Sequence, residues 1–237
     1  MKKSITKNYI YNLAYQILVI IIPIITTPYV SRVLGAESIG IYSYTLSIAT
    51  YFILFGSLGI ALYGQREIAY KQDNKKEYSK TFWEIVILRF ITMSIATITF
   101  YFAFVFRKNE YSTYYGILLL ELIGNAFEIG WFFQGLEDFK KTVTRNLVVK
   151  LISVISIFVF VKSKNDLAKY FVIYVLSTLL GNASLWLYLP KTLEQVKINE
   201  LNIVKHIKPT ISLFIPQVAT QISKGHITYV IAYEKKA

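Results

Sequence analysis

The chain has 237 residues, of which 54% are hydrophobic and 17% charged, and it carries a formal net charge of +12. A soluble domain carries about a quarter charged residues, and the long apolar runs are unlike the short alternating segments of a membrane barrel. The Lys and Arg residues lie mostly in loops between apolar runs, which favours contact with anionic headgroups and argues against nucleic acid as a partner. We therefore expect an all-α, polytopic helical membrane protein. With no Cys and only His206 and His226, the chain offers neither disulfides nor a metal site.

Six apolar runs are predicted to cross the membrane, because a helix of about 20 residues spans a hydrocarbon core of roughly 30 Å. They cover about Ile10–Val33, Ile39–Leu62, Trp83–Phe106, Tyr111–Phe133, Leu147–Val161 and Lys169–Leu189, where Pro190 stops the last one. A seventh apolar segment begins near Ile207 and loses its pattern after Ser223. We thus expect a six-helix lobe (1–190), a cytoplasmic linker (191–206), the start of a seventh helix (207–223) and an off-pattern tail (224–237).

The stretch Pro23–Gly40, PIITTPYVSRVLGAESIG, joins the first two spans. It is predicted to place Pro23 inside the first span and a tight external turn over 35–40. Because neighbouring helices can satisfy the backbone groups that a proline frees, Pro23 and Pro28 are candidate hinges. We expect Pro28 and Arg32 to belong to an outward-facing gate or a lobe contact.

The orientation is predicted from the Lys and Arg residues of alternate connections. One side holds sixteen of them, which are Lys2, Lys3, Lys7, Arg66, Lys71, Lys75, Lys76, Lys80, Lys140, Lys141, Arg145, Lys150, Lys191, Lys197, Lys205 and Lys208. The other side holds six, which are Arg32, Arg107, Lys108, Lys162, Lys164 and Lys169. The side with sixteen, which includes the N-terminus, is predicted to be cytoplasmic.

Two connections on that side, Arg66–Thr81 and Lys191–Lys205, mix charges with sparse apolar residues. Each is either a short helix on the inner membrane surface or a solvated loop.

Ionisable side chains inside the hydrocarbon region cost several kcal/mol, so each of them is expected to have a structural or functional role. In the fourth span, Glu121, Gly124, Asn125 and Glu128 share one helical face, which must look at another helix or a cavity. Arg89 in the third span lies at a similar depth to Glu128, so the two either form an ion pair or Arg89 reaches the inner headgroups.

Glu121 lies nearer the midplane. It is either a carboxylate that couples transport to a proton or cation, part of a polar lining that faces substrate, or a protonated carboxyl hydrogen-bonded between helices. Asn182 in the sixth span is expected to form a hydrogen bond between helices. No catalytic signature is present.

Three motifs in order carry a resemblance to a known family. They are Gln16 with Pro23–Gly40, the segment GIALYGQREIA that starts at Gly59, and WFFQGLEDF that starts at Trp131. Together they resemble the N-terminal half of the polysaccharide biosynthesis flippases, which belong to the multidrug/oligosaccharidyl-lipid/polysaccharide exporter superfamily. The resemblance covers about residues 1–222.

This resemblance implies two six-helix lobes around a central cavity in the bacterial cytoplasmic membrane, with alternating access to its two faces. The implied cargo is an undecaprenyl-diphosphate-linked oligosaccharide of capsule or O-antigen synthesis, and the implied partners are the polysaccharide polymerase and glycosyltransferases of that pathway. Arg32, Arg66 and Arg89 are candidates for binding the diphosphate, and Glu121, Asn125 and Glu128 for lining the cavity. For Arg32 and Arg66 the alternative is a salt bridge at a helix end, with Glu37 and Glu67 close in sequence.

Family members are longer, and the tail from Lys224 departs from their pattern, so we expect a truncated or frame-shifted product. The other hypotheses are an ion-coupled drug exporter of the same superfamily, a membrane-bound glycosyl- or acyltransferase that uses Glu137 and Asp138, and an inactive fragment. No enzymatic activity, cofactor or metal is expected.

Overall fold

The computed structural model describes the backbone of residues 5–234 and the side-chain environments of Leu13 and residues 20–221. All regular structure in the described part is helical, which confirms the all-α prediction. The helices are α1 (Ile5–Ser57), α2 (Ile60–Lys71), α3 (Lys75–Phe100), α4 (Ser112–Ala126), α5 (Gly130–Gly135), α6 (Phe139–Phe160), α7 (Leu167–Leu185), α8 (Leu189–Thr192) and α9 (Ile207–Glu234). A π-helical turn, Tyr101–Val105, extends α3.

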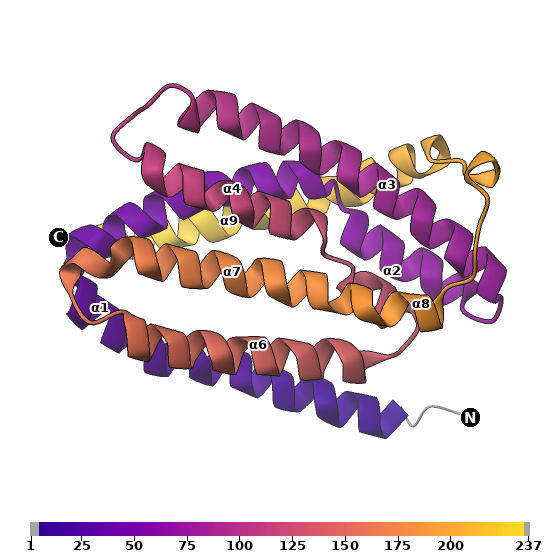
Figure 1. Cartoon of the computed structure of the whole chain (residues 1–237), viewed down its shortest axis with the longest axis horizontal. Coiled ribbons are helices and arrows are strands. Elements are labelled where there is room, and N and C mark those ends of the chain that lie inside the picture. The colour runs from indigo at the N-terminus through magenta and orange to yellow at the C-terminus, as the bar shows by residue number, and fades with distance from the viewer. Residues whose placement is uncertain (1–4, 235–237) are drawn as a thin grey trace.

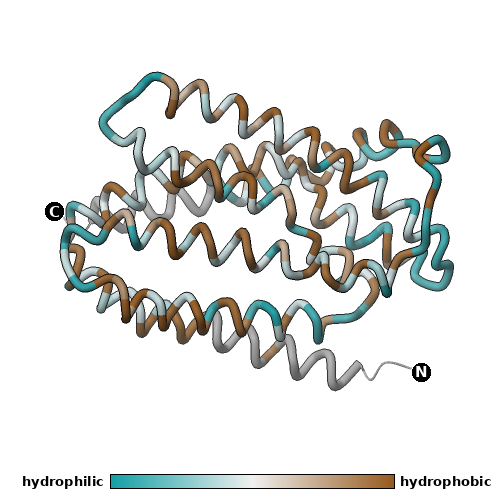
Figure 2. The backbone as a smooth tube through the Cα atoms, viewed as in Figure 1, coloured by the Kyte–Doolittle hydropathy of each residue, from teal (hydrophilic) through white to brown (hydrophobic). Residues whose placement is uncertain are grey.

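Long helices run roughly parallel or antiparallel through the molecule (Figure 1). Five stretches are long and apolar enough to cross a membrane, and these are Ile20–Lys71, Lys75–Val105, Ser112–Gly135, Phe139–Phe160 and Lys164–Thr192. Figure 2 shows hydrophobic residues along these helices and hydrophilic residues gathered where the chain turns. The protein is therefore a multi-pass membrane protein.

The first stretch holds two arms, because α1 bends sharply at Gly35. Gly35 has φ +81° and ψ 167°, a conformation open essentially to glycine alone. The chain reverses there (Figure 1), which agrees with the prediction of two spans. However, the turn is one residue long, and Gly40 already lies in the second arm. The backbone remains helical across Pro23 and Pro28, so the bend in α1 lies at neither proline.

The second arm ends at Ser57, earlier than predicted, and Gly59 in the left-handed conformation (φ +71°) starts α2. The connection Arg66–Thr81 is therefore not a surface helix of its own. Its first residues end α2, and α3 begins at Lys75, capped by the Asn74 side chain, which accepts a hydrogen bond from the amide of Glu77. Hydropathy alone does not reveal this boundary between α1 and α2, because α2 directly follows the spanning arm and carries polar residues that read as a loop.

The fourth span is also interrupted, because α4 ends at Ala126 and α5 starts at Gly130. The fifth helix begins at Phe139, eight residues before the predicted start at Leu147, so Arg145 and Lys150 lie on α6 rather than in a loop. The sixth span does not stop at Pro190. Pro190 occupies the first turn of α8, where its missing N–H costs nothing.

The segment between α8 and α9, residues 193–206, is called the connector. It contains only short 3₁₀ turns at Ile198–Glu200 and Val204–His206, so it is a loop and not the surface helix considered for Lys191–Lys205. The α9 backbone is helical to Glu234, past the point where the apolar pattern ends.

The buried side chains form two hydrophobic cores, one at each end of the helices. The core at the α2 end is aromatic and includes Phe82, Trp131, Phe132 and Phe133. The core at the Gly35 end includes Leu34, Met93, Tyr115 and Phe171. On α3 the two cores are separated by the few residues between Leu88 and Met93, and residues near this level carry most of the polar side chains discussed next.

Candidate functional site

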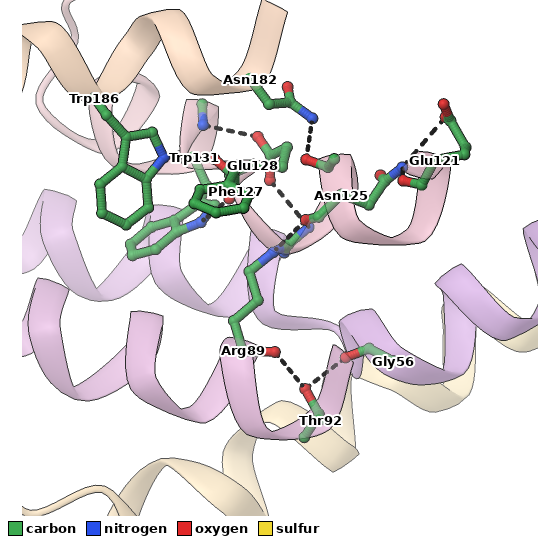
Figure 3. A network of polar contacts seen from close by, with 12 residues as sticks. Gly56, Arg89, Thr92, Glu121, Asn125, Phe127, Glu128, Trp131, Asn182 and Trp186 are labelled. Carbon is green, nitrogen blue, oxygen red and sulfur yellow. Dashed lines mark hydrogen bonds and ion pairs between the residues drawn. The ribbon is translucent and has the colours of Figure 1, made fainter. Parts of the chain in front are cut away.

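A group of polar residues lies between the two cores, and we call it the polar belt. It comprises Gly56 of α1, Arg89 and Thr92 of α3, Glu121 and Asn125 of α4, Glu128, Arg145 of α6 and Asn182 of α7 (Figure 3, which labels all of these except Arg145). On α3, for example, Arg89 follows Leu88 of the aromatic core and Thr92 precedes Met93 of the other core. On α3 the belt residues therefore lie between the two cores.

Arg89 is buried, with 3% of its surface exposed. Its Nε and Nη2 donate to the carbonyl oxygen of Asn125 at 3.0 Å and 2.8 Å. That carbonyl belongs to the last turn of α4, where the helix dipole favours a cation. Arg89 therefore caps α4, and its Nη1 has no hydrogen-bond partner within the described part of the chain.

Glu128 lies in the gap between α4 and α5 and pairs with Arg89 at 3.4 Å between Oε2 and Nη2. This confirms the ion pair predicted from sequence. The other carboxylate oxygen accepts a hydrogen bond from the amide of Gly130, the first residue of α5, at 2.7 Å. The pair thus joins the C-terminus of one helix to the N-terminus of the next, each matched by a charge of the favourable sign.

Two tryptophans satisfy carbonyls of the same gap. Trp131 Nε1 donates to the Glu128 carbonyl at 3.3 Å, and Trp186 Nε1 donates to the Phe127 carbonyl at 2.8 Å. Unpaired buried carbonyls would cost free energy, so the break in the fourth span is held open by specific donors from α3, α5 and the end of α7.

Glu121 is buried on α4 in the same belt. Asn125 Nδ2 donates to the Glu121 carbonyl at 2.9 Å and to its Oε1 at 3.3 Å. Glu121 Oε2 has no hydrogen-bond partner among the described residues. A buried carboxyl oxygen without a partner is costly, so this oxygen is a place where a proton or cation would be stabilised.

One turn further along α4, Asn182 Nδ2 donates to the Gly124 carbonyl at 2.9 Å, which confirms the predicted hydrogen bond between helices. Arg145 Nη1 in turn donates to Asn182 Oδ1 at 3.4 Å. The helices approach closely because Gly124 has no side chain; a Cβ there would lie 3.0 Å from the backbone of Leu179.

The sequence reasoning missed three belt members. Arg145 was placed in a loop, because its helix was predicted to start later. Thr92, whose hydroxyl donates to the Gly56 carbonyl at 2.6 Å, links α3 to α1. Gly56 is the third missed member, and neither a lone threonine nor a glycine stands in a sequence pattern that would mark it as a contact between helices.

Two candidate residues lie outside the belt, at opposite ends of the molecule. Arg32 is exposed near the Gly35 bend, and Arg66 is exposed on α2, where its guanidinium lies 6.0 Å from the Tyr70 ring centroid. Among the ion pairs of residues 20–221, neither arginine takes part, and Glu67 pairs instead with Lys71 at 3.1 Å. The suggested salt bridges to Glu37 and Glu67 therefore do not form in this structure.

The belt is a network of charge, amide and hydroxyl groups, and within residues 20–221 no three His, Asp or Glu side chains gather as metal ligands would. Such a network can hold helix ends in place and can take up a proton or cation at Glu121. Pro23 and Pro28 lie on the first arm of α1, remote in sequence from these groups and exposed.

Comparison with known proteins places the chain among its relatives. Residues 5–236 match the family described as "Polysaccharide biosynthesis protein". A protein of Escherichia coli (strain K12) described as "Putative O-antigen transporter" is 29% identical over 170 residues, which cover 70% of this chain and 41% of that protein. A protein of Shigella dysenteriae with the same description is 30% identical over 147 residues, 61% of this chain and 37% of that protein. The chain thus spans about two fifths of the length of these relatives. No solved structure matches it.

Proposed function

Because the chain belongs to the polysaccharide biosynthesis protein family, we propose that it serves the transport of lipid-linked oligosaccharide repeat units across the bacterial cytoplasmic membrane. The proposed cargo is an undecaprenyl-diphosphate-linked oligosaccharide used for capsule or O-antigen synthesis. The descriptions of the two relatives as O-antigen transporters support this cargo class. The polymerase and glycosyltransferases of the same pathway are the proposed partners, and we assign the chain no enzymatic step.

The observation that carries the proposal is a hydroxyl-bearing face on the second arm of α1. Ser43, Tyr44, Ser47 and Tyr51 follow one another at spacings of one, three and four residues, and all four are exposed on a membrane-spanning helix. The Ser47 hydroxyl donates to the Ser43 carbonyl at 2.7 Å, whereas hydrocarbon offers the tyrosine hydroxyls no partner. Sugar hydroxyls would offer hydrogen bonds, and tyrosine rings provide an apolar surface with a polar tip. We infer that this face lines the path of the oligosaccharide.

The charged candidates then divide into two proposed roles. Arg32 and Arg66 are exposed and have no ion-pair partner in the described part of the chain, so either could donate to the diphosphate. Arg89, Asn125 and Glu128 already bind one another, so we assign them to the support of the path rather than to the cargo.

Glu121 is the proposed coupling group. Within the described residues its buried Oε2 has no hydrogen-bond partner, which suits the uptake of a proton or cation during transport. Replacement of Glu121 by Gln keeps the shape of the side chain and removes its ability to take up and release a proton or cation. We expect Glu121→Gln to retain binding of the lipid-linked cargo and to lose transport driven by an ion gradient.

The test is transport of a fluorescent undecaprenyl-diphosphate oligosaccharide in proteoliposomes that contain the purified chain. We expect the double substitution Tyr44→Ala/Ser47→Ala to reduce transport at least tenfold. The control is Tyr101→Ala in the π-helical turn after α3, another exposed tyrosine, with 40% of its surface exposed against 57% for Tyr44. The proposal is refuted if no transport is observed either with this chain alone or with a mixture of this chain and the C-terminal part of the Escherichia coli relative.

A further inference from the structure

A second cluster of buried titratable groups lies at the α2 end, apart from the polar belt. Glu84 of α3 is 0% exposed and His206 of the connector is 1% exposed. Glu84 Oε2 lies 2.7 Å from Lys205 Nζ and 2.8 Å from His206 Nε2, while Oε1 accepts from the Asn202 amide at 2.8 Å. On the other edge of the imidazole, Nδ1 lies 2.7 Å from the Tyr63 hydroxyl of α2. We call these five residues the Glu84 clamp.

The clamp is the last of several attachments that fix the connector along α3. Tyr78 donates from its hydroxyl to the Thr192 carbonyl at 2.9 Å, just before the connector begins. The Glu194 amide then donates to Ser79 Oγ at 3.0 Å. The connector is therefore attached to α3 at its start and at its end, and it does not behave as a free linker between helices.

The helix that follows is seated by the same region. Thr210, in the first turn of α9, donates from its hydroxyl to the His206 carbonyl at 2.9 Å. Gly59, at the break between α1 and α2, touches the α9 backbone so closely that a Cβ would lie 2.7 Å from the Thr210 carbonyl oxygen and 2.8 Å from the Phe214 nitrogen. One end of α9 is thus fixed to α2 and α3 by the clamp and by this close backbone contact.

We propose that Glu84 and His206 are positioning residues for transport, because they hold the connector and the start of α9 against α2 and α3. This rests on the proposed function. Loss of the clamp would remove the side-chain part of this attachment and leave the backbone contact at Gly59 to hold the start of α9, which weakens its coupling to α2 and α3.

Neutral His206 satisfies the hydrogen bonding of the clamp, since Nε2–H donates to Glu84 and Nδ1 accepts from Tyr63. In the protonated form Nδ1–H would instead donate to the Tyr63 oxygen, and the Tyr63 hydroxyl hydrogen would need another acceptor. Burial lowers the pKa of His206, and the charges of Lys205 and Lys71 act in the same direction, while Glu84 opposes them.

The sign of the pH effect follows from this shift. When the pKa of a histidine is lower in the folded protein than its ordinary value of about 6.5, the side chain is neutral in both states above pH 6.5, and it does not lower the stability of the fold there. Stability falls as the pH drops from about 6.5 toward the lowered pKa, because only the unfolded or unclamped state takes up the proton there. The clamp is therefore strongest at neutral pH and weakens in acid.

The test measures hydrogen-exchange protection factors of the connector in the purified full chain at pH 7.5 and pH 5.5. We expect Glu84→Ala to lower the protection of the Asn202 amide about tenfold at pH 7.5, since this amide loses its charged acceptor. In the unaltered chain, protection should fall at pH 5.5, and in His206→Gln it should not change with pH, because glutamine does not titrate. Glu200→Gln, an exposed acid on the same connector, is the control.

The same variants are then assayed for transport in proteoliposomes. If Glu84→Ala does not fold, Glu84→Gln and His206→Gln provide the comparison. The proposal predicts loss of both connector protection and transport in the clamp variants and retention of both in Glu200→Gln. Unchanged protection in the clamp variants overturns the clamp, and lost protection with normal transport overturns its positioning role. Absence of transport in the unaltered chain instead overturns the proposed function and leaves the protection measurement valid.

Discussion

Arg89 illustrates how a buried charge is used in this membrane protein. Its guanidinium binds the Asn125 carbonyl in the last turn of α4 and the carboxylate of Glu128, which itself binds the first amide of α5. Removing one partner of a buried pair leaves an uncompensated charge, which costs more than the pair contributes. Arg89 therefore stabilises the break between α4 and α5 by binding a backbone carbonyl and the carboxylate of Glu128.

We expect Arg89→Ala to destabilise the chain by about 3 kcal/mol or more, because Glu128 and the Asn125 carbonyl lose their partner. The double variant Arg89→Ala/Glu128→Gln should cost less than the sum of the single variants, with a coupling of about 0.5–3 kcal/mol. Thermal unfolding of the detergent-solubilised chain measures both, with the exposed Arg107→Ala as control. Strictly additive effects would argue against the pair.

Gly64 is a second residue whose role is steric. A Cβ at this position would lie 2.5 Å from the indole ring of the buried Trp131. We expect Gly64→Ala to lower stability by about 1–3 kcal/mol through overpacking. Gly116→Ala in α4 is the control, because a Cβ there meets nothing within 4 Å. Equal unfolding temperatures for the two variants would show that α2 and α5 can move apart freely.

Among the elements, α1 shows most clearly how one residue sets the path of a helix. A single glycine reverses the chain, and the arms on either side then pack on different neighbours. The first arm places Tyr29 against Phe158 of α6, with ring centroids 4.4 Å apart, and the second places Phe52 against Phe100 of α3 at 5.3 Å.

Gly35→Ala should therefore destabilise the chain by about 1–3 kcal/mol, since its φ of +81° strains any residue with a Cβ. Gly40→Ala lies inside a helix with open space around it and should be neutral or stabilising by about 0.5–1 kcal/mol. The difference between the two unfolding temperatures measures the strain. A Gly35→Ala variant as stable as Gly40→Ala would mean that the bend can form with an ordinary residue.

The broken fourth span is a further feature of element scale. Helices that stop inside a membrane protein expose backbone groups that must find partners or bind ligands. Here Arg89, Glu128, Trp131 and Trp186 supply the partners, and α5 packs on α2 beyond the break. The break therefore builds the aromatic core at the α2 end.

For the molecule as a whole, the orientation in the membrane remains a prediction from the distribution of Lys and Arg. The absence of Cys makes it directly testable, because single cysteines can be introduced without background. We expect Lys108→Cys to react with a membrane-impermeant maleimide in intact cells and Lys76→Cys to react only after permeabilisation. The opposite labelling pattern would reverse the predicted topology.

The sequence by itself determined the fold class and the apolar runs, and it offered the ion pair of Arg89 with Glu128 as one of two alternatives. These follow from run length, from the cost of charge in hydrocarbon and from helical spacing, all of which are local or nearly local properties. It also singled out Pro23–Gly40, although the bend falls on Gly35 alone and the prolines remain within a continuous helix.

Only the tertiary structure decided where helices break and which distant groups meet. The separation of α2 from the second arm of α1, the early start of α6 and the Glu84 clamp all depend on partners far away in the chain. His206 and Glu84 are 122 residues apart, and neither stands in a pattern that marks it. The physical reason is that a buried polar group is stabilised by whichever donor or acceptor the packing brings to it, and packing is a property of the whole molecule.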